Sequence, residues 1–311
     1  MTSLDFGPLV LGGNVFGWTA NTDESFAVLD AFVAAGGVAI DTADVYSAWA
    51  PGNSGGESET IIGEWLASRG HRNRVVIATK VFQHPERQGL SAANIRAAID
   101  DSLRRLQTDY VDLYYAHRDD PDVPQDEYVS AFDELVRAGK VREVGASAFT
   151  AERLSSAVEY ATTNGLTPFT VSQDHYNLAD RRYESKLRDT VDQLGLVEVP
   201  YYSLASGFLT GKYRPGVAVD SARAGTAAAY LEDPKNLRLL AALDEVAQNH
   251  RTSVTAVALA WLAAQPTVVA PLASARTVAQ LPDLMAGAEL RLSPNELERL
   301  SAVEGTHPSA G

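Results

Sequence analysis

The sequence predicts a closed (β/α)₈ barrel, in which eight parallel strands alternate with helices, built as a single domain over residues 1–311. Short apolar or β-branched runs alternate with longer helical patterns along the whole chain, which is typical of a parallel sheet covered by helices. Eight such runs occur, and each is almost continuously apolar, as in strands buried on both faces. An open doubly wound sheet is the alternative, but a closed barrel leaves no exposed edge.

The eight predicted strands share a length of four to seven residues and are enriched in valine, isoleucine and aromatic residues. Five of them end in Asp, Lys, His, Ser or Gln, as expected where a buried strand reaches the rim of a barrel. They cover residues 10–13, 38–41, 75–80, 111–117, 141–147, 169–173, 197–202 and 268–271.

The predicted helices carry apolar residues at positions i, i+3, i+4 and i+7, and several begin after Ser, Thr or Asp and end at Gly. A polar connection at 212–235 is too long for a simple turn, and loops of that length are usually functional covers or disordered. A last amphipathic helix at 293–305 is expected to lie over the barrel. The other helical patterns cover residues 24–36, 57–70, 94–107, 128–140, 151–165, 234–250 and 253–265.

Composition limits the partners that this chain can have. Its 26 basic and 40 acidic residues give a formal net charge of −14, which disfavours binding to nucleic acid and to anionic membranes. The chain has no cysteine, no run of about 18 apolar residues and no signal-like N-terminus. We therefore expect a cytoplasmic protein whose partner is a small molecule, and the sequence leaves its oligomeric state open.

Polar residues at the carboxyl ends of three adjacent strands form the most informative group. Asp41 ends the second strand, Lys80 the third and His117 the fourth, and Tyr46 follows Asp41 by five residues. In a parallel barrel all strands end on one rim, where active sites are assembled. These four side chains are therefore expected to meet.

This group suits the reduction of a carbonyl by hydride transfer. The carbonyl oxygen must be protonated or polarised as negative charge develops on it. Tyr46 could donate that proton, although a free phenol with a pKa of about 10 is a weak acid. We expect Lys80 to lower the pKa of Tyr46, Asp41 to keep Lys80 charged and oriented, and His117 to orient the substrate oxygen.

The same residues belong to an ordered series of motifs that resembles the aldo-keto reductase family over nearly the whole chain. The resemblance implies a (β/α)₈ barrel that uses NAD(P)H, usually NADPH, with Asp41, Tyr46, Lys80 and His117 as the catalytic tetrad. The motifs are DTADVY (41–46), GESETIIG (56–63), IATK (77–80), YYAH (114–117), GKVREVGAS (139–147), QDHYNL (173–178) and LASGFLTGKY (204–213).

The resemblance also implies which residues hold the cofactor. Ser147 and Gln173 match residues that bind the nicotinamide carboxamide, and Tyr201 matches the aromatic residue that stacks on the nicotinamide ring. The pyrophosphate would be held by Leu204, Ser206, Gly207 and Lys212, and the adenosine 2′-phosphate by Ser274, Arg276 and Gln280.

Arg276 also predicts NADPH without the family, because a guanidinium at the start of a helix combines a cation with free backbone amides. A Rossmann site is not predicted, since no G-x-G-x-x-G follows a strand.

Some positions depart from the family pattern. Ala148 stands after Ser147 where the family commonly has Asn, which removes or replaces one contact to the nicotinamide carboxamide. The usual Tyr-Ser-Pro-Leu of the seventh strand is here Tyr201-Tyr202-Ser203-Leu204. Trp49 and Phe82 are candidate walls of the substrate pocket. The other five histidines have no spacing suited to a metal site: His71, His84, His175, His250 and His307.

Two other functions are compatible with the sequence. The chain could bind NADPH as a regulatory subunit with little turnover, as channel-associated members of the family do. Lys80 could instead form a Schiff base in a barrel aldolase. Steady NADPH consumption with a simple aldehyde would separate the reductase from the regulatory subunit, and borohydride trapping would reveal the aldolase.

Overall fold

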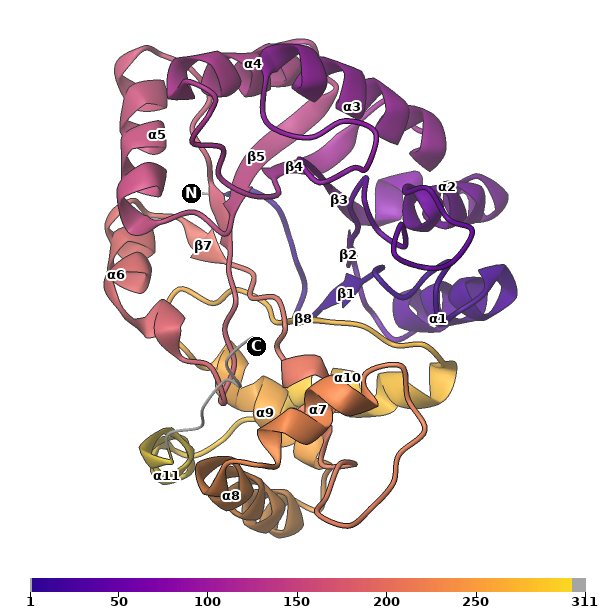
Figure 1. Cartoon of the computed structure of the whole chain (residues 1–311), viewed down its shortest axis with the longest axis vertical. Coiled ribbons are helices and arrows are strands. Elements are labelled where there is room, and N and C mark those ends of the chain that lie inside the picture. The colour runs from indigo at the N-terminus through magenta and orange to yellow at the C-terminus, as the bar shows by residue number, and fades with distance from the viewer. Residues whose placement is uncertain (1, 304–311) are drawn as a thin grey trace.

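A computed structural model, which describes residues 2–303, contains one eight-stranded parallel sheet with the order β7-β6-β5-β4-β3-β2-β1-β8 (Figure 1). Neighbours in this order are also neighbours in the sequence, except for β1 and β8, which pair directly as closure of a barrel requires. The strands are β1 (Val10–Gly12), β2 (Ala39–Asp41), β3 (Val76–Val81), β4 (Val111–Ala116), β5 (Val141–Ser147), β6 (Val171–Gln173), β7 (Val197–Glu198) and β8 (Leu272–Ala273).

The barrel closes between β7 and the segment that leads into β8. Glu198 forms a parallel bridge with Val268, and the N–H of Leu272 donates to the carbonyl of Pro200 at 3.1 Å. The predicted eighth strand at 268–271 is displaced, because Pro271 has no N–H and divides the segment. Its first part pairs with Glu198, while Leu272 and Ala273 pair with β1. The seventh strand likewise ends at Glu198, before Pro200.

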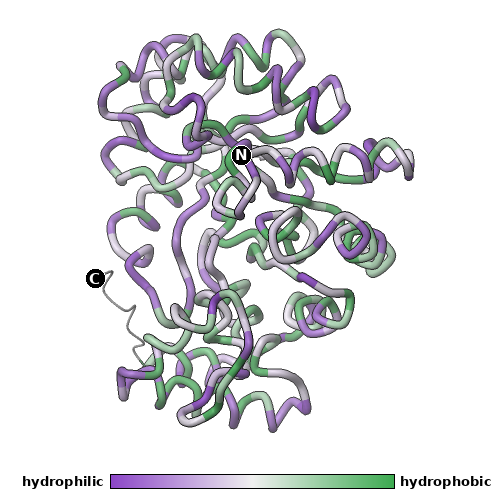
Figure 2. The backbone as a smooth tube through the Cα atoms, turned by 45° about the vertical axis from the view of Figure 1, so that its right-hand side comes forward, coloured by the Kyte–Doolittle hydropathy of each residue, from purple (hydrophilic) through white to green (hydrophobic). Residues whose placement is uncertain are grey.

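Six helices follow one another around the outside of the sheet (Figure 1). Side-chain caps fix the start of three of them: Asn21 caps α1, Ser91 caps α3 and Thr150 caps α5. Figure 2 shows hydrophobic and hydrophilic residues within the same helices, as expected for helices with one face on the sheet. Their bounds are α1 (Thr22–Ala34), α2 (Glu57–Arg69), α3 (Ala92–Leu106), α4 (Gln125–Arg137), α5 (Ala151–Thr163) and α6 (Lys186–Gln193).

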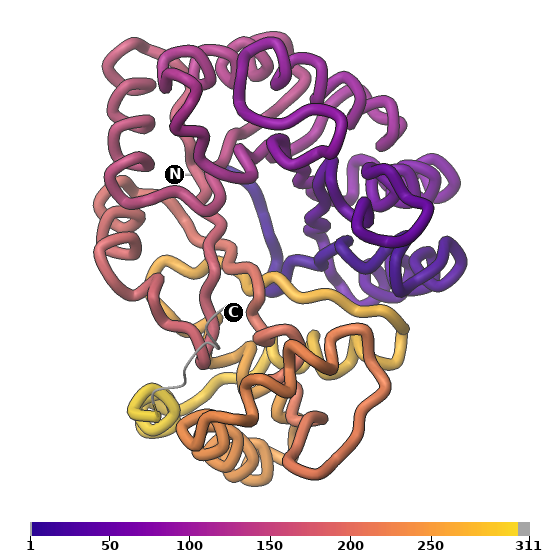
Figure 3. The backbone as a smooth tube through the Cα atoms, viewed as in Figure 1, coloured from indigo at the N-terminus to yellow at the C-terminus, as the bar shows by residue number. Residues whose placement is uncertain are grey.

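The C-terminal third of the described chain gathers at one side of the barrel, below the sheet in Figure 1. The predicted long connection after the seventh strand is present and makes a wide excursion before α8, as the orange tube of Figure 3 shows. It contains one short helix, α7, which the sequence pattern did not predict. The helices of this part are α7 (Ala224–Tyr230), α8 (Pro234–His250), α9 (Val254–Ala263), α10 (Leu281–Glu289) and α11 (Pro294–Ala302).

Two groups of buried apolar side chains stabilise this architecture. One fills the space between the sheet and the helices and includes Phe32, Trp65 and Trp261. The other lies within the barrel and includes Leu113 and Val171, together with Phe6 from the segment before β1. The interior is therefore a packed core, and only the rim is free to bind a ligand. Among residues 2–303 we find no helix with the length and apolar character needed to span a bilayer.

Candidate active site

The register of the sheet brings Asp41 and Lys80 together at the carboxyl rim. Asp41 is the last residue of β2, which pairs in parallel with β3, where Lys80 lies. The Lys80 Nζ donates to Asp41 Oδ2 at 2.6 Å and to the carbonyl of Thr42 at 2.8 Å. Both charged side chains are 0% exposed, so each depends on the other to offset its loss of hydration.

Tyr46 joins this pair from the turn that follows β2. The N–H of Thr42 continues the sheet by donating to the carbonyl of Ala78, and the N–H of Tyr46 closes a turn on Ala43. The Tyr46 hydroxyl accepts from Lys80 Nζ at 3.0 Å and donates to Asp41 Oδ2 at 3.3 Å. The half-buried phenol thus lies within hydrogen-bonding distance of both charged groups, as the sequence predicts.

His117 faces the same tyrosine from the end of β4. Its N–H donates to the carbonyl of Val81, and its ring centroid lies 6.0 Å from that of Tyr46. The imidazole Nδ1 is buried and has no hydrogen-bond partner among residues 2–303. Burial, and secondarily the charge of Lys80, hold the pKa of His117 well below its ordinary value. The imidazole is therefore neutral at pH 7 and can act as a hydrogen-bonding group for a ligand.

The electrostatics of Tyr46 differ from the sequence-based expectation. Burial, and then the Asp41 carboxylate, raise the pKa of Tyr46 well above its ordinary value. Burial also lowers the pKa of Lys80, although Asp41 opposes this effect. The expectation of a lowered pKa for Tyr46 is thus wrong for the ligand-free site, because burial of the phenol and the nearby Asp41 carboxylate outweigh the ammonium of Lys80. The phenol keeps its proton at neutral pH.

Two residues predicted to hold the nicotinamide carboxamide lie side by side on this rim. Ser147 ends β5 and pairs in register with Gln173, the last residue of β6. Gln173 Nε2 donates to Asp41 Oδ1 at 3.1 Å, so that in the ligand-free site it holds the carboxylate in place. The next residue, Ala148, has a φ of 53°, in the left-handed region that favours Gly or Asn.

The residues predicted to stack on the nicotinamide and hold the pyrophosphate follow β7. Tyr201 bridges to His175, and the two ring centroids are 5.5 Å apart. Ser206 and Gly207 adopt φ values of 56° and 96°, within a short 3₁₀ segment that begins after Leu204. The exposed Lys212 follows, with its Nζ 4.9 Å from the ring centroid of Tyr213. Tyr202, which departs from the family pattern, has a φ of 55° and so adopts a left-handed backbone conformation.

The residues predicted to hold the 2′-phosphate follow β8. Ser274 Oγ donates to Asn14 Oδ1 at 2.6 Å. Gln280 Oε1 accepts from the N–H of Arg276 at 2.7 Å, so the side chain of Gln280 occupies the amide expected to face a phosphate. The half-buried side chain of Arg276 forms no ion pair with any carboxylate of residues 2–303. Its guanidinium therefore remains available to an anion.

The two predicted substrate residues differ in their surroundings. Trp49 is 48% exposed and its ring lies edge-on to that of Tyr46, with the centroids 6.0 Å apart. Phe82 packs against the hydrophobic layer between sheet and helices. Sequence reasoning did not identify Trp18, whose ring lies 5.7 Å from that of Trp49. The signal available was its position in the segment that follows the first strand, on the same rim.

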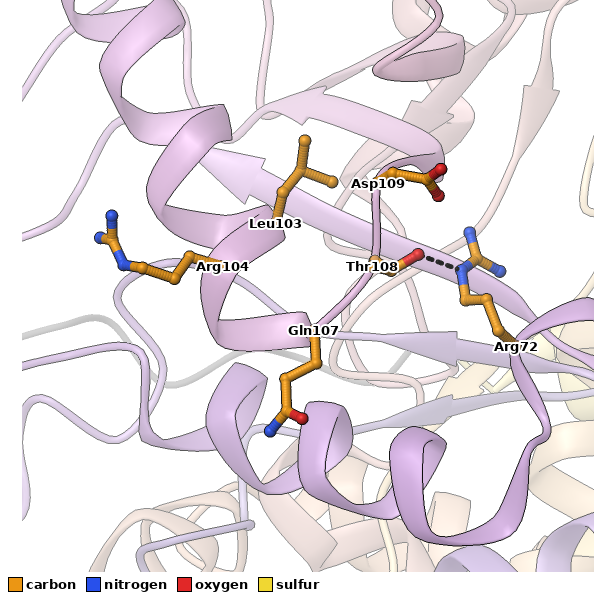
Figure 4. A pocket seen from close by; sticks show the side chains of 6 residues that line it. All are labelled: Arg72, Leu103, Arg104, Gln107, Thr108 and Asp109. Carbon is orange, nitrogen blue, oxygen red and sulfur yellow. Dashed lines mark hydrogen bonds between the residues drawn. The ribbon is translucent and has the colours of Figure 1, made fainter.

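Two hollows on the surface are lined by none of the four tetrad residues Asp41, Tyr46, Lys80 and His117. The hollow of Figure 4 lies where α3 leads into β4, at the opposite rim of the barrel, and Arg72 there donates to Thr108 Oγ1 at 3.0 Å. A second hollow lies on the same rim as the tetrad and is lined by Ala148, His175 and Tyr201, the last of which is predicted to stack on the nicotinamide. Among residues 2–303 no three His, Asp or Glu side chains are grouped as metal ligands, and His307 lies outside these residues.

Comparison with known proteins agrees with this geometry. Residues 8–304 match the model of the aldo/keto reductase family. An uncharacterized oxidoreductase of Bacillus subtilis, YrpG, is 34% identical over 97% of this chain and 93% of its own length. Norsolorinic acid reductase StcV of Emericella nidulans is 33% identical over 97% of this chain and 78% of its own length. A Saccharomyces cerevisiae protein named as a putative aryl-alcohol dehydrogenase, AAD14, is 32% identical over 95% of this chain and 82% of its own length. The chain therefore belongs to the aldo/keto reductase family of oxidoreductases.

Proposed function

We propose that this protein reduces an aldehyde or ketone to an alcohol with NADPH, and that Tyr46 is the general acid. The observation that carries the proposal is the position of the Tyr46 hydroxyl, 3.0 Å from the Lys80 ammonium and beside a neutral His117. A protonated phenol next to a fixed cation can give up its proton to an oxygen that becomes negative during the reaction. Lys80 then stabilises the phenolate that remains.

The residues present suit a nicotinamide dinucleotide phosphate. Within the described part of the chain, Arg276 has no acidic partner and the Nδ1 of His117 has no hydrogen-bond partner, and Ser206 and Gly207 lie in a left-handed backbone segment. When bound, the reduced cofactor supplies a hydride to the carbonyl carbon, while Tyr46 supplies the proton to the oxygen. Arg276 favours NADPH over NADH, because its guanidinium matches the additional phosphate.

The contacts of Lys80 disfavour the aldolase alternative. Its ammonium donates to Asp41, to the Thr42 carbonyl and to Tyr46, and its side chain is 0% exposed. A Schiff-base lysine must be neutral and must reach the substrate carbonyl. Lys80 would have to leave all three partners to do so, which makes a supporting role for this residue the better proposal.

The aromatic side chains at the mouth favour an aromatic substrate. The exposed Trp49 and the half-buried Trp18 form an edge-to-face pair, and Trp49 lies next to the phenol. Aromatic rings add both buried area and a favourable pair geometry to binding. A relative named as an aryl-alcohol dehydrogenase supports the same substrate class. We therefore propose aromatic aldehydes and ketones as substrates.

Turnover of 4-nitrobenzaldehyde, followed by the loss of NADPH absorbance, tests this proposal. We expect Tyr46→Phe to reduce kcat by about 10²- to 10⁴-fold, the usual contribution of a general acid, while NADPH binds with unchanged affinity. The matched control is Tyr202→Phe, at a tyrosine that is 49% exposed on the same rim. Retained turnover in Tyr46→Phe would remove Tyr46 from its role as acid. A wild-type protein that binds NADPH without consuming it would instead be a regulatory subunit.

A further inference from the structure

A second arginine lies near the mouth of the site without an acidic partner. Arg223 precedes α7 in the long connection after β7, and its side chain is half-buried. No carboxylate of residues 2–303 lies within ion-pair distance of it, whereas Arg214 on the same connection pairs with Asp244 at 2.6 Å. The chain carries 40 acidic and only 26 basic residues, so a free guanidinium in a partly buried position is unexpected from composition alone.

Ring contacts connect Arg223 to the phenol that the proposed reaction uses. The guanidinium carbon of Arg223 lies 5.8 Å from the ring centroid of Trp18. Trp18 packs edge-on against Trp49 at 5.7 Å, and Trp49 packs against Tyr46 at 6.0 Å. The cation is therefore two aromatic rings away from the proposed general acid.

The surroundings of Arg223 disfavour the charge of its guanidinium. Partial burial lowers the pKa of its guanidinium, and the nearby Arg276 contributes in the same direction. A guanidinium nevertheless stays charged in proteins, so this position costs free energy when it has no counterion. An anion at this position would recover part of that cost through a charge-assisted hydrogen bond.

We propose that Arg223 is a specificity-determining residue, which selects aromatic carbonyl substrates that carry a carboxylate group. The substrate ring would lie against Trp18 and Trp49, with its carboxylate directed to Arg223. This inference rests on the proposed function and extends it to a substrate class. A phosphate of the cofactor is the other possible anion. The substrate carboxylate is favoured because Arg223 contacts Trp18, whereas Lys212 and Arg276 already supply cations to the predicted phosphate positions.

A pair of substrates that differ only in charge tests the proposal. The wild-type enzyme is assayed with NADPH and either 4-carboxybenzaldehyde or methyl 4-formylbenzoate. We expect a lower KM for the carboxylate, and a fall of about tenfold or more in the carboxylate-to-ester ratio of kcat/KM in Arg223→Met. Arg223→Lys should keep part of the preference, because it keeps the charge. Arg238→Met, at an exposed arginine on α8, is the control and should keep the wild-type ratio.

A binding measurement tests the preference for a carboxylate without requiring turnover. Titration of tryptophan fluorescence with 4-(hydroxymethyl)benzoate and with its methyl ester should show tighter binding of the carboxylate, which Arg223→Met removes. Charge-selective binding without turnover would support the inference while contradicting the proposed reaction. Turnover without preference for the carboxylate would overturn the inference and leave the reaction standing. Weaker NADPH binding in Arg223→Met, with equal losses for both substrates, would overturn it in favour of a cofactor phosphate.

Discussion

The two halves of the proposed site differ in how their charges are paired. On the rim of β2 to β4, the Lys80 ammonium is within hydrogen-bonding distance of Asp41 and Tyr46 before any ligand binds. After β7 and β8, the guanidinium groups of Arg223 and Arg276 have no carboxylate partner among residues 2–303. The lysine of the first half is thus already paired, while the second half has cations that a bound anion could pair.

The backbone shows the same difference. Asp41 and Lys80 lie in regular strands, whose register alone brings them together. Three consecutive residues after β7, Ala205 to Gly207, have φ values of 47°, 56° and 96°. Left-handed conformations in residues other than glycine cost about 1–3 kcal/mol each and are found mainly at functional sites. Regular strands therefore position Asp41 and Lys80, whereas the residues predicted to hold the pyrophosphate lie in a loop with left-handed backbone.

The largest expected effect concerns Asp44, an acidic residue in the first half of the site that is an exception to the pairing of its charges. Asp44, between Asp41 and Tyr46, is fully buried and forms no ion pair among the described residues. Burial, and then the charge of Glu59, raise its pKa from 3.8 to about 8. A carboxyl with a raised pKa favours folding least when it is ionised, so its contribution to stability falls as the pH rises from about 4 through 8.

We therefore expect Asp44→Asn to stabilise the protein by on the order of 2–4 kcal/mol more at pH 8.5 than at pH 5. Urea unfolding at the two pH values measures this difference. Asp220→Asn, at an exposed aspartate, is the control and should give no such pH dependence. An equal effect of Asp44→Asn at both pH values would mean that Asp44 is ionised in the folded protein throughout this range.

The next prediction tests whether the second half needs an anion. Arg276→Ala should weaken the binding of NADPH by about 10- to 100-fold, the value of a charge-assisted hydrogen bond, and the binding of NADH much less. Fluorescence titration with the two cofactors measures the ratio, and Arg238→Ala is the control for a lost surface charge. Equal losses for both cofactors would place the 2′-phosphate elsewhere.

The smallest effect concerns Ala148, which follows Ser147 and whose N–H donates to the carbonyl of Gln173. Its φ of 53° suits Gly or Asn better than Ala, so Ala148→Gly and Ala148→Asn should each stabilise the fold by up to about 1 kcal/mol. Only Asn adds an amide that can reach the nicotinamide carboxamide, so only Ala148→Asn should also lower the KM for NADPH. Urea unfolding and steady-state kinetics separate the two effects. Loss of stability in both variants would show that the alanine methyl group is needed for packing.

The sequence was most informative where residue type and strand position agree. Asp41, Lys80 and His117 were predicted to meet because each follows an apolar strand, and the parallel register confirms their common rim. The predicted eighth strand was misplaced, because pairing with two different neighbours around Pro271 leaves no periodic signal. The predicted direction of the Tyr46 pKa shift was also wrong, since it depends first on burial of the phenol and then on its distance to Asp41, and no spacing in the sequence gives either.

The amino-acid sequence by itself determined the alternation of strands and helices, and the polar residues at or next to the carboxyl ends of β2 to β6. These features depend on local periodicity and on turn-forming residues, which short stretches of chain encode. Only the tertiary structure decided that Trp18 and Arg223, 205 positions apart, contact each other, and that no carboxylate of residues 2–303 pairs with Arg223. Closure of the barrel brings the first and last strands together, so contacts between such distant residues follow from packing of the whole chain.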